Sequence, residues 1–161
     1  MTEKEIICAL KNVLVNEYGF VRRGKHFYKD ICNDLTIVFG LQKSRYGEYA
    51  YLERGYCIKS INQYLPYPKF YQLNLNCGRI MTKNGQAIRF AEVDEHYMEA
   101  LIKIIIREYQ EMSKRAELEK EQFIAYYLEE AKDLSWYILG DATAAYFGLT
   151  RKDFQFHFAN D

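Results

Sequence analysis

The sequence predicts an α+β fold, in which an antiparallel sheet of about four or five strands from the N-terminal half carries an N-terminal helix and a C-terminal group of helices packed on one face. Three observations support this prediction. A helix start signal opens the chain, strand-like alternation follows, and helical periodicity replaces it in the C-terminal half. The length of 161 residues suits one domain, so we expect a single domain over 1–161, with a helix at 1–19, a sheet at 20–90 and a helical part at 94–158.

The N-terminal helix is predicted from a start signal, an apolar stripe and a stop signal. Thr2 followed three residues later by Glu5 is a capping box. The stripe at helical spacing consists of Ile6, Leu10, Val13 and Leu14. Gly19 supplies the C-terminal stop, so we expect this helix over about residues 3–18.

A hairpin and a second turn follow this helix. Residues 20–23 and 25–30 form the two arms of the hairpin, and Gly24 lies at its turn. The pair Asn33-Asp34 supplies the turn into the next strand, since both residue types tolerate tight turns.

The strand from residue 35 alternates cleanly between an apolar and a more polar row. The apolar row is Leu35, Ile37, Phe39 and Leu41, and the opposite row is Thr36, Val38, Gly40, Gln42 and Ser44. We expect the apolar row to be core and the opposite row to face solvent or a partner.

Two further strands complete the predicted sheet. One covers residues 48–61, where Gly55 indicates a β-bulge, and the prolines within 62–68 then mark a loop. The other covers residues 70–77, with Tyr71, Leu73, Leu75 and Cys77 on one side and Gln72, Asn74 and Asn76 on the other.

The C-terminal half is predicted to be helical. One stripe, N-capped near Asp94, consists of Met98, Leu101, Ile102, Ile105, Tyr109 and Met112, and a second consists of Ile124, Tyr127, Leu128, Ala131, Leu134 and Ile138. We place a break between them near 113–117, although a projecting or dimer-forming helix would show the same pattern, so homodimerisation stays open. A short helix from Gly140-Asp141 and a last turn at 150–153 follow.

Charge and cysteine usage exclude several classes of protein. The formal net charge is zero, which gives no global electrostatic argument for a nucleic-acid or membrane partner, although residues 20–45 hold six basic and two acidic side chains. The four cysteines lie far apart and lack metal-ligand spacing. We expect neither a cofactor nor a metal site. With no apolar run of membrane-spanning length and no secretory signal, the sequence predicts a cytoplasmic protein with reduced thiols.

Four segments of the first half carry a resemblance to a known family. They are the helix ending in Tyr18-Gly19-Phe20, the turn and strand Gly24 to Tyr28, the strand closing on Leu41-Gln42-Lys43-Ser44, and the strand Tyr51 to Lys59, with a weaker continuation at Leu75 to Ile80. The chain resembles the bacterial family catalogued as domain of unknown function 4304. The resemblance implies a compact intracellular bacterial domain and supplies no residue with an assigned role. Residues 147–161 match no family pattern.

The candidate binding face combines the polar strand ends with nearby tyrosines. Its predicted members are Gln42, Lys43, Ser44, Arg45, Tyr49, Tyr51, Gln72, Asn74 and Asn76. Carboxamides can hold a polar ligand or a partner's backbone, the cations add affinity for anions, and tyrosines are favoured at protein interfaces. The same pattern is also typical of the wet side of an antiparallel sheet, so a purely structural role is the alternative.

Three functions remain open at this point. The leading hypothesis is a non-enzymatic protein-binding module, immunity-like or regulatory, because no nucleophile elbow, phosphate loop, dinucleotide fingerprint or zinc-protease motif is present. The alternative is an enzyme of unfamiliar type, such as a hydrolase or nuclease, that uses His26 or Glu53 beside Lys43 and Arg45. The third is single-stranded nucleic-acid binding, which is disfavoured because the basic residues mostly precede Tyr46 while the aromatic residues follow it.

Overall fold

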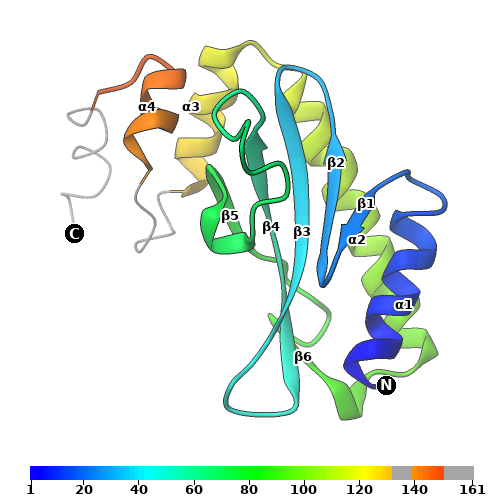
Figure 1. The fold of residues 1–161 in the computed structure, drawn as a ribbon. Helices are drawn as coiled ribbons and strands as arrows, with labels where there is room; N and C mark the ends of the chain where they lie inside the picture. The colour runs from blue at the N-terminus through cyan, green and yellow to red at the C-terminus, as the bar shows by residue number, and fades with distance from the viewer. Residues whose placement is uncertain (132–138, 151–161) are drawn as a thin grey trace.

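An antiparallel sheet with helices on one face forms the protein, as the sequence predicted (Figure 1). The sheet has six strands, against the four or five predicted. The structure is a computed structural model that describes residues 1–131 and 139–150. Its elements are α1 (Glu3–Leu14), β1 (Val21–Arg23), β2 (His26–Asp30), β3 (Leu35–Lys43), β4 (Tyr49–Ile58), the 3-10 helix η1 (Phe70–Gln72), β5 (Leu75–Arg79), β6 (Ala87–Arg89), the 3-10 helix η2 (Phe90–Glu92), α2 (Glu95–Ala116), α3 (Lys120–Ala131) and α4 (Asp141–Tyr146).

The strands follow the order β1-β2-β3-β4-β5, and β6 also pairs with β4. β5 pairs with β4 between Glu53 and Tyr56, whereas β6 pairs with it between Tyr49 and Tyr51. The main core lies between the sheet and the helices, with α2 behind the sheet in the view of Figure 1. Its most buried members include Phe27, Ile37, Phe39, Leu52, Leu75 and Leu101.

Helix α1 begins as predicted and ends earlier than predicted. The Thr2 side chain accepts from the Glu5 amide, and the Glu5 carboxylate accepts from the Thr2 amide. The helix ends at Leu14 instead of residue 18, because the Phe20 amide donates to the Leu14 carbonyl across Gly19, whose φ is +68°. This motif turns Phe20 into the core.

The hairpin, the second turn and the bulge are confirmed. Arg23 pairs with His26, so Gly24 and the residue after it form a two-residue turn. Asn33 and Asp34 both have positive φ, as their tight turn requires. The pairing of β4 with β5 shifts register beside the predicted bulge residue of β4.

The last predicted strand begins later than predicted, and the sheet contains one further strand that was not predicted. Residues 70–72 form η1 instead of a strand, since the Lys69 amide donates to the Gln72 side chain and closes a turn. β5 starts only at Leu75, and the separate short strand β6 had no counterpart in the prediction.

The more polar row of β3 is also corrected. Thr36, Val38 and Gly40 are buried instead of facing solvent. The chain between β4 and β5 covers Val38, because it folds over part of the sheet face opposite α1 and α2 (Figure 1), hereafter the outer face. A second hydrophobic cluster forms there from Tyr28, Val38, Cys57, Leu73 and Phe70. The His26 ring lies over Gly40.

The helical half agrees with the predicted periodicity where the structure describes it. The Asp94 side chain caps α2 by accepting from the Tyr97 amide at 2.7 Å, and the break between α2 and α3 falls at residues 117–119. The predicted helix beginning at Gly140-Asp141 is α4. The stripe positions Leu134 and Ile138 and the end of the turn at 150–153 lie outside the described residues. None of the described helices has the length and apolar composition needed to cross a membrane.

Candidate functional site: a cationic pocket on the outer face

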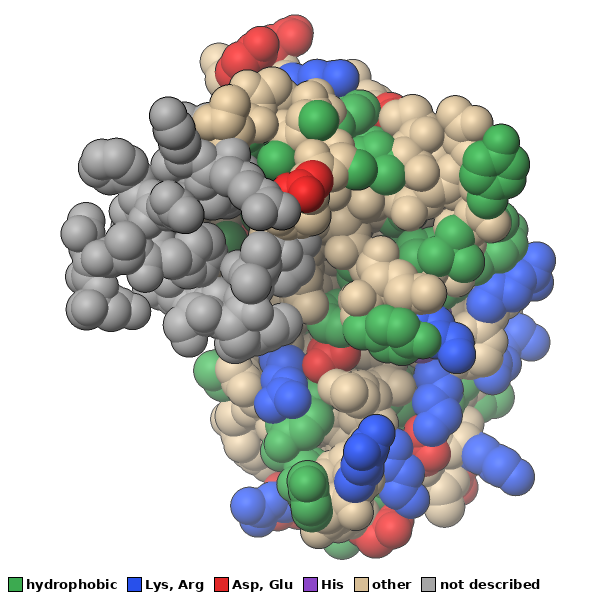
Figure 2. Space-filling view, turned by 60° about the vertical axis from the view of Figure 1, so that its left-hand side comes forward, with side chains coloured by type: hydrophobic (Ala, Val, Ile, Leu, Met, Phe, Trp, Pro, Cys, Tyr) green, Lys and Arg blue, Asp and Glu red, His purple; other side chains and the backbone are tan. Residues whose placement is uncertain are grey.

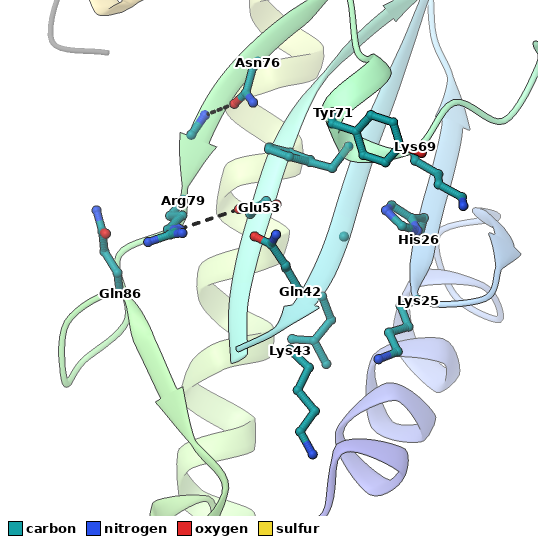
Figure 3. Close-up of a pocket in the computed structure, with 14 residues that line it drawn as sticks. Lys25, His26, Gln42, Lys43, Glu53, Lys69, Tyr71, Asn76, Arg79 and Gln86 are labelled. Atoms are coloured by element: carbon teal, nitrogen blue, oxygen red, sulfur yellow. Dashed lines mark hydrogen bonds and ion pairs between the residues drawn. The ribbon is translucent and has the colours of Figure 1, made fainter. Parts of the chain in front are cut away.

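A pocket of about 690 Å³ opens on the outer face of the sheet, beside the part covered by the chain between β4 and β5 (Figure 3). Its volume lies in the range of small-molecule sites. The lining residues come from β2, β3, β4, β5 and the loops between them, and are Lys25, His26, Gly40, Leu41, Gln42, Lys43, Glu53, Lys69, Phe70, Tyr71, Asn76, Gly78, Arg79 and Gln86.

A cross-strand row of three residues forms the base of this pocket. His26 on β2 and Glu53 on β4 both pair with Gly40 on β3, from opposite sides. The two outer residues are therefore separated by two strand spacings, or about 10 Å between their Cα atoms. Because Gly40 has no side chain, the His26 ring can lie over it: a Cβ atom on Gly40 would lie only 2.9 Å from Cδ2 of His26.

A glycine also directs Arg79 into the pocket. Alternation along β5 would send Arg79 to the helix side together with Leu75, but Gly78 has a φ of +77° and shifts the alternation by one residue. The Asn76 side chain holds this conformation, since its Oδ1 accepts from the Gly78 amide at 2.7 Å. As a result Arg79 pairs with Glu53, with 3.6 Å between Nε and Oε1.

The Glu53 carboxylate is the acidic group of the pocket. Its side chain is only 8% exposed, and burial raises its pKa above the ordinary value, an effect that Arg79 partly offsets. In the amide orientation that satisfies both groups, the Gln42 nitrogen donates to Oε1 at 2.6 Å. Gln42 and Arg79 therefore both interact with the Glu53 carboxylate, the first by a hydrogen bond and the second by an ion pair.

The opposite end of the pocket is cationic. His26 lies between Lys25 and Lys69 (Figure 3), and burial together with these two ammonium groups lowers its pKa. Lys25 also pairs with Glu3 of α1, and Lys43 pairs with Glu48 at 3.2 Å. Lys69 has no ion-pair partner within residues 1–131 and 139–150.

The structure brings some of the predicted face together and places the rest elsewhere. Gln42, Lys43 and Asn76 line the pocket. Gln72 caps η1, and Asn74 accepts from the Ile58 amide at 2.7 Å, so both take part in backbone structure away from the pocket.

The remaining predicted members lie at the β3–β4 turn. Ser44 and Arg45 follow the end of β3. The rings of Tyr49 and Tyr51 pack edge to face, with 5.6 Å between their centroids, and hydrogen bonds from the Ser44 and Tyr51 side chains lower the pKa of Tyr49. The Arg79 guanidinium lies 3.5 Å from the centre of the Tyr51 ring, which joins this group to the pocket.

Several pocket residues were absent from the predicted face. His26 and Glu53 were considered only for the enzyme alternative, and the cations Lys25, Lys69 and Arg79 were not assigned to the site. The sequence offered one signal for the position of His26. A two-residue hairpin turn fixes the register of β1 and β2, and this register makes His26 the first residue of β2. Among the described residues, no cluster of three or more His, Cys, Asp or Glu side chains is placed to hold a metal ion.

Comparison with known protein families identifies a match that covers most of the chain. The family described as domain of unknown function (DUF4304) matches residues 11–146. The chain belongs to this family. The match extends well beyond the first half that carried the resemblance, since it includes every strand, α2, α3 and α4, and with them the whole pocket. No curated protein and no solved structure matches this DUF4304 chain.

Proposed function

We propose that this DUF4304 chain is a non-enzymatic binding module that receives an acidic segment of another protein on its outer face. The observation that carries the proposal is the charge of the pocket. Four cationic side chains and a histidine line it, against one carboxylate, Glu53, that pairs with Arg79. Lys25 and Lys43 also pair with Glu3 and Glu48 at the rim, and Lys69 adds a further positive charge. Such an excess of one sign in a partly enclosed site attracts anionic groups.

Exposed apolar and aromatic side chains of the chain between β4 and β5 supply contact area for a protein partner, and one of them, Tyr71, lines the pocket. Tyr64 is 99% exposed and Tyr71 78%, with Leu65 and Tyr67 also exposed nearby in the chain. Tyrosine and arginine dominate the energetics of protein interfaces. Figure 2 shows Lys and Arg side chains beside hydrophobic ones over the lower and right-hand part of the surface in that view.

A charge reversal inside the pocket tests this proposal. We compare Lys69→Glu with Lys59→Glu, an exposed lysine of the same connecting segment that does not line the pocket. Each variant and the wild type serve as bait in lysate at two salt concentrations. We expect proteins that the wild type and Lys59→Glu retain, that Lys69→Glu loses, and whose retention falls with salt. Identical partner lists for Lys69→Glu and the wild type would contradict the proposal.

We also propose a cytoplasmic location, in which all four cysteines stay reduced; Cys57 is buried and Cys77 partly buried, whereas Cys8 and Cys32 are exposed. Burial raises the pKa of Cys57 to about 11 and that of Cys77 to about 12, so both resist ionisation. None of the four cysteines forms a disulfide.

An enzyme is the second candidate, and one observation favours it: His26 and Glu53 lie on either side of Gly40 and both line the pocket. A substrate held there would have a base or acid on each side. Against it, no hydrogen bond in the described part of the chain joins His26 to a carboxylate. Turnover of chromogenic phosphate or carboxylate esters that disappears in both His26→Asn and Glu53→Gln would support an enzyme, and no turnover would remove it.

The case for single-stranded nucleic acid is stronger in the structure than in the sequence. Basic and aromatic residues that are separate in the sequence meet in space, since Arg23 lies 4.6 Å from the ring centre of Tyr67 and Arg79 contacts Tyr51. Base stacking on such pairs would give affinity that falls steeply with salt. Fluorescence anisotropy with labelled oligonucleotides measures this, and binding that salt does not weaken would remove the candidate.

A further inference from the structure

We propose that the Lys25, His26 and Lys69 end of the pocket binds the phosphate group of a phosphate monoester. This inference uses the same pocket as the proposed function, and it depends on that proposal in no other way. Three nitrogen donors reach this end from three segments: Lys25 from the β1–β2 turn, His26 from the start of β2 and Lys69 from the residue before η1. Figure 3 shows the three side chains on one side of the pocket, away from Arg79.

The kind of donor favours phosphate over carboxylate. A planar carboxylate is best matched by the two-pronged guanidinium of arginine. The arginine of this pocket, Arg79, is engaged by Glu53 and stacks on Tyr51. The donors at the other end are the ammonium group of Lys25, which also pairs with Glu3 of α1, the ammonium group of Lys69 and the imidazole of His26. These groups act as separate points. A tetrahedral dianion accepts hydrogen bonds from several directions and suits them.

His26 makes this subsite responsive to protonation. Its ring lies over Gly40, beside Tyr28, whose own pKa is raised to about 12, so that phenol stays protonated. Burial disfavours a proton on the imidazole and lowers its pKa, and repulsion by Lys69 and Lys25 adds to this effect. A bound dianion offsets the repulsion, so His26 takes up a proton on binding and becomes a third cationic donor.

The other charged groups of the pocket do not reverse this effect. Glu53 lies across Gly40 and is compensated by Arg79, Lys43 is paired with Glu48, and Glu3 of α1, outside the lining, is paired with Lys25. The described residues place no uncompensated carboxylate within the pocket lining that could hold the His26 proton without a ligand.

The size of the pocket favours an ester over free phosphate. Its volume of about 690 Å³ leaves room beyond one phosphate group. The pocket lining carries two aromatic rings and three carboxamides, from Phe70, Tyr71, Gln42, Asn76 and Gln86. An organic group with a ring and hydrogen-bonding atoms fits these walls.

The first test measures anion selectivity by titration, with NMR chemical shifts as the readout. The probes are acetate, inorganic phosphate, phenyl phosphate, and a tyrosine peptide with and without phosphorylation. We expect no detectable acetate binding and tighter binding of phenyl phosphate than of inorganic phosphate. Lys69→Ala should weaken phenyl phosphate about tenfold, the loss of one charge-assisted hydrogen bond, while Lys59→Ala leaves it unchanged. Equal binding of acetate and phosphate, or an unchanged Lys69→Ala, would overturn the subsite.

The same probes distinguish the two sources of the monoester and separate this inference from the proposed function. Stronger binding of phenyl phosphate than of the phosphopeptide indicates a small metabolite, and the reverse indicates a phosphorylated protein. If phenyl phosphate binds while the wild-type, Lys69→Glu and Lys59→Glu baits retain the same proteins, the phosphate subsite is supported and the proposed protein partner is contradicted. If proteins are retained through Lys69 but phosphate and acetate bind alike, the partner stands and the phosphate subsite does not.

The second test isolates His26 by using sulfate, a tetrahedral dianion that does not take up a proton near neutral pH. We expect wild-type affinity for sulfate to rise as pH falls from about 8 to about 6, by at most about tenfold per pH unit for one coupled proton. His26→Asn keeps a side-chain N–H donor without a titrating group, so its affinity should not vary with pH. Equal slopes for the two proteins would exclude the role of His26.

Discussion

His26 and Glu53 face each other across Gly40, because both residues pair with this glycine from opposite sides of β3. The arrangement gives the pocket two chemically different ends. The His26 end carries Lys25 and Lys69, and the Glu53 end is neutralised by Arg79. A ligand with one anionic group therefore has one favourable orientation.

Gly40→Ala should displace His26 without unfolding the protein. The new Cβ would lie 2.9 Å from Cδ2 and 3.3 Å from Nε2 of His26, which forces the ring to move. We expect the free energy of unfolding to change by less than about 1 kcal/mol, since a strand residue tolerates alanine and the unfolded chain loses freedom. Sulfate affinity, measured by titration calorimetry, should fall about tenfold. Gly140→Ala is the control, because its Cβ meets nothing within 4 Å. Wild-type affinity in Gly40→Ala would show that the ring position is unimportant.

Glu53→Gln should change the pH dependence of stability. Burial raises the pKa of Glu53 in the folded state, so ionisation is less favourable there than in the unfolded chain. The stability of the wild type should therefore fall relative to Glu53→Gln as pH rises from about 4 to about 7. Arg79 is 40% exposed and stays hydrated without its partner. Urea unfolding at several pH values measures the difference. The exposed Glu99, changed to Gln, serves as control, and a stability difference that grows in favour of the wild type with pH would refute the expectation.

Gly55→Ala should destabilise the protein by about 1–3 kcal/mol through overpacking. A Cβ at this bulge would lie 2.5 Å from the Leu75 carbonyl oxygen and 2.8 Å from Cδ1 of Leu73. The first contact is with backbone, which cannot move without disturbing the β4–β5 pairing. Urea denaturation monitored by circular dichroism gives the free energy, with Gly140→Ala again as the control. A change below about 0.5 kcal/mol would mean that β5 relaxes freely.

Asn74→Ala should cost about 1–3 kcal/mol of stability, because it leaves the buried Ile58 amide without its acceptor. The same side chain connects to Asn62 and, through Nδ2, to the Thr143 hydroxyl at 3.3 Å. Thermal unfolding compared with Gln63→Ala, an exposed position of the preceding loop, measures the loss. Sulfate affinity of the folded variant should equal that of the wild type. Weakened sulfate binding with unchanged stability would show that Asn74 acts in ligand binding and would contradict its structural role.

Local patterns were enough to predict most of the fold. The capping box at Thr2, the turn at Asn33-Asp34 and the cap at Asp94 each rest on neighbouring residues, and the structure confirms all three. Errors arose where distant segments decide the outcome. The burial of Val38 depends on a loop that begins about twenty residues later in the sequence and folds back over the sheet, and no local pattern reveals that contact.

The candidate site was predictable only in part. Alternation placed Gln42 on the outer face, and the structure places it in the pocket. The same alternation would place Arg79 on the helix side. The shift at Gly78 depends on its positive φ, and a single glycine in a strand does not by itself predict a positive φ. Asn74 and Asn76 looked alike in the sequence, yet hydrogen bonds to different backbone groups separate their roles.

The sequence by itself determined the α+β class, the helix start signals, the hairpin and the apolar row of β3, since each depends on spacing and on residues close together in the chain. Only the tertiary structure decided which polar residues share a site. Strand register places His26 and Glu53 on either side of Gly40, a bulge turns Arg79 from the helix side toward the pocket, and a loop brings Lys69 to His26. Register and loop placement follow from the packing of the whole core, and for that reason the pocket could be recognised only in three dimensions.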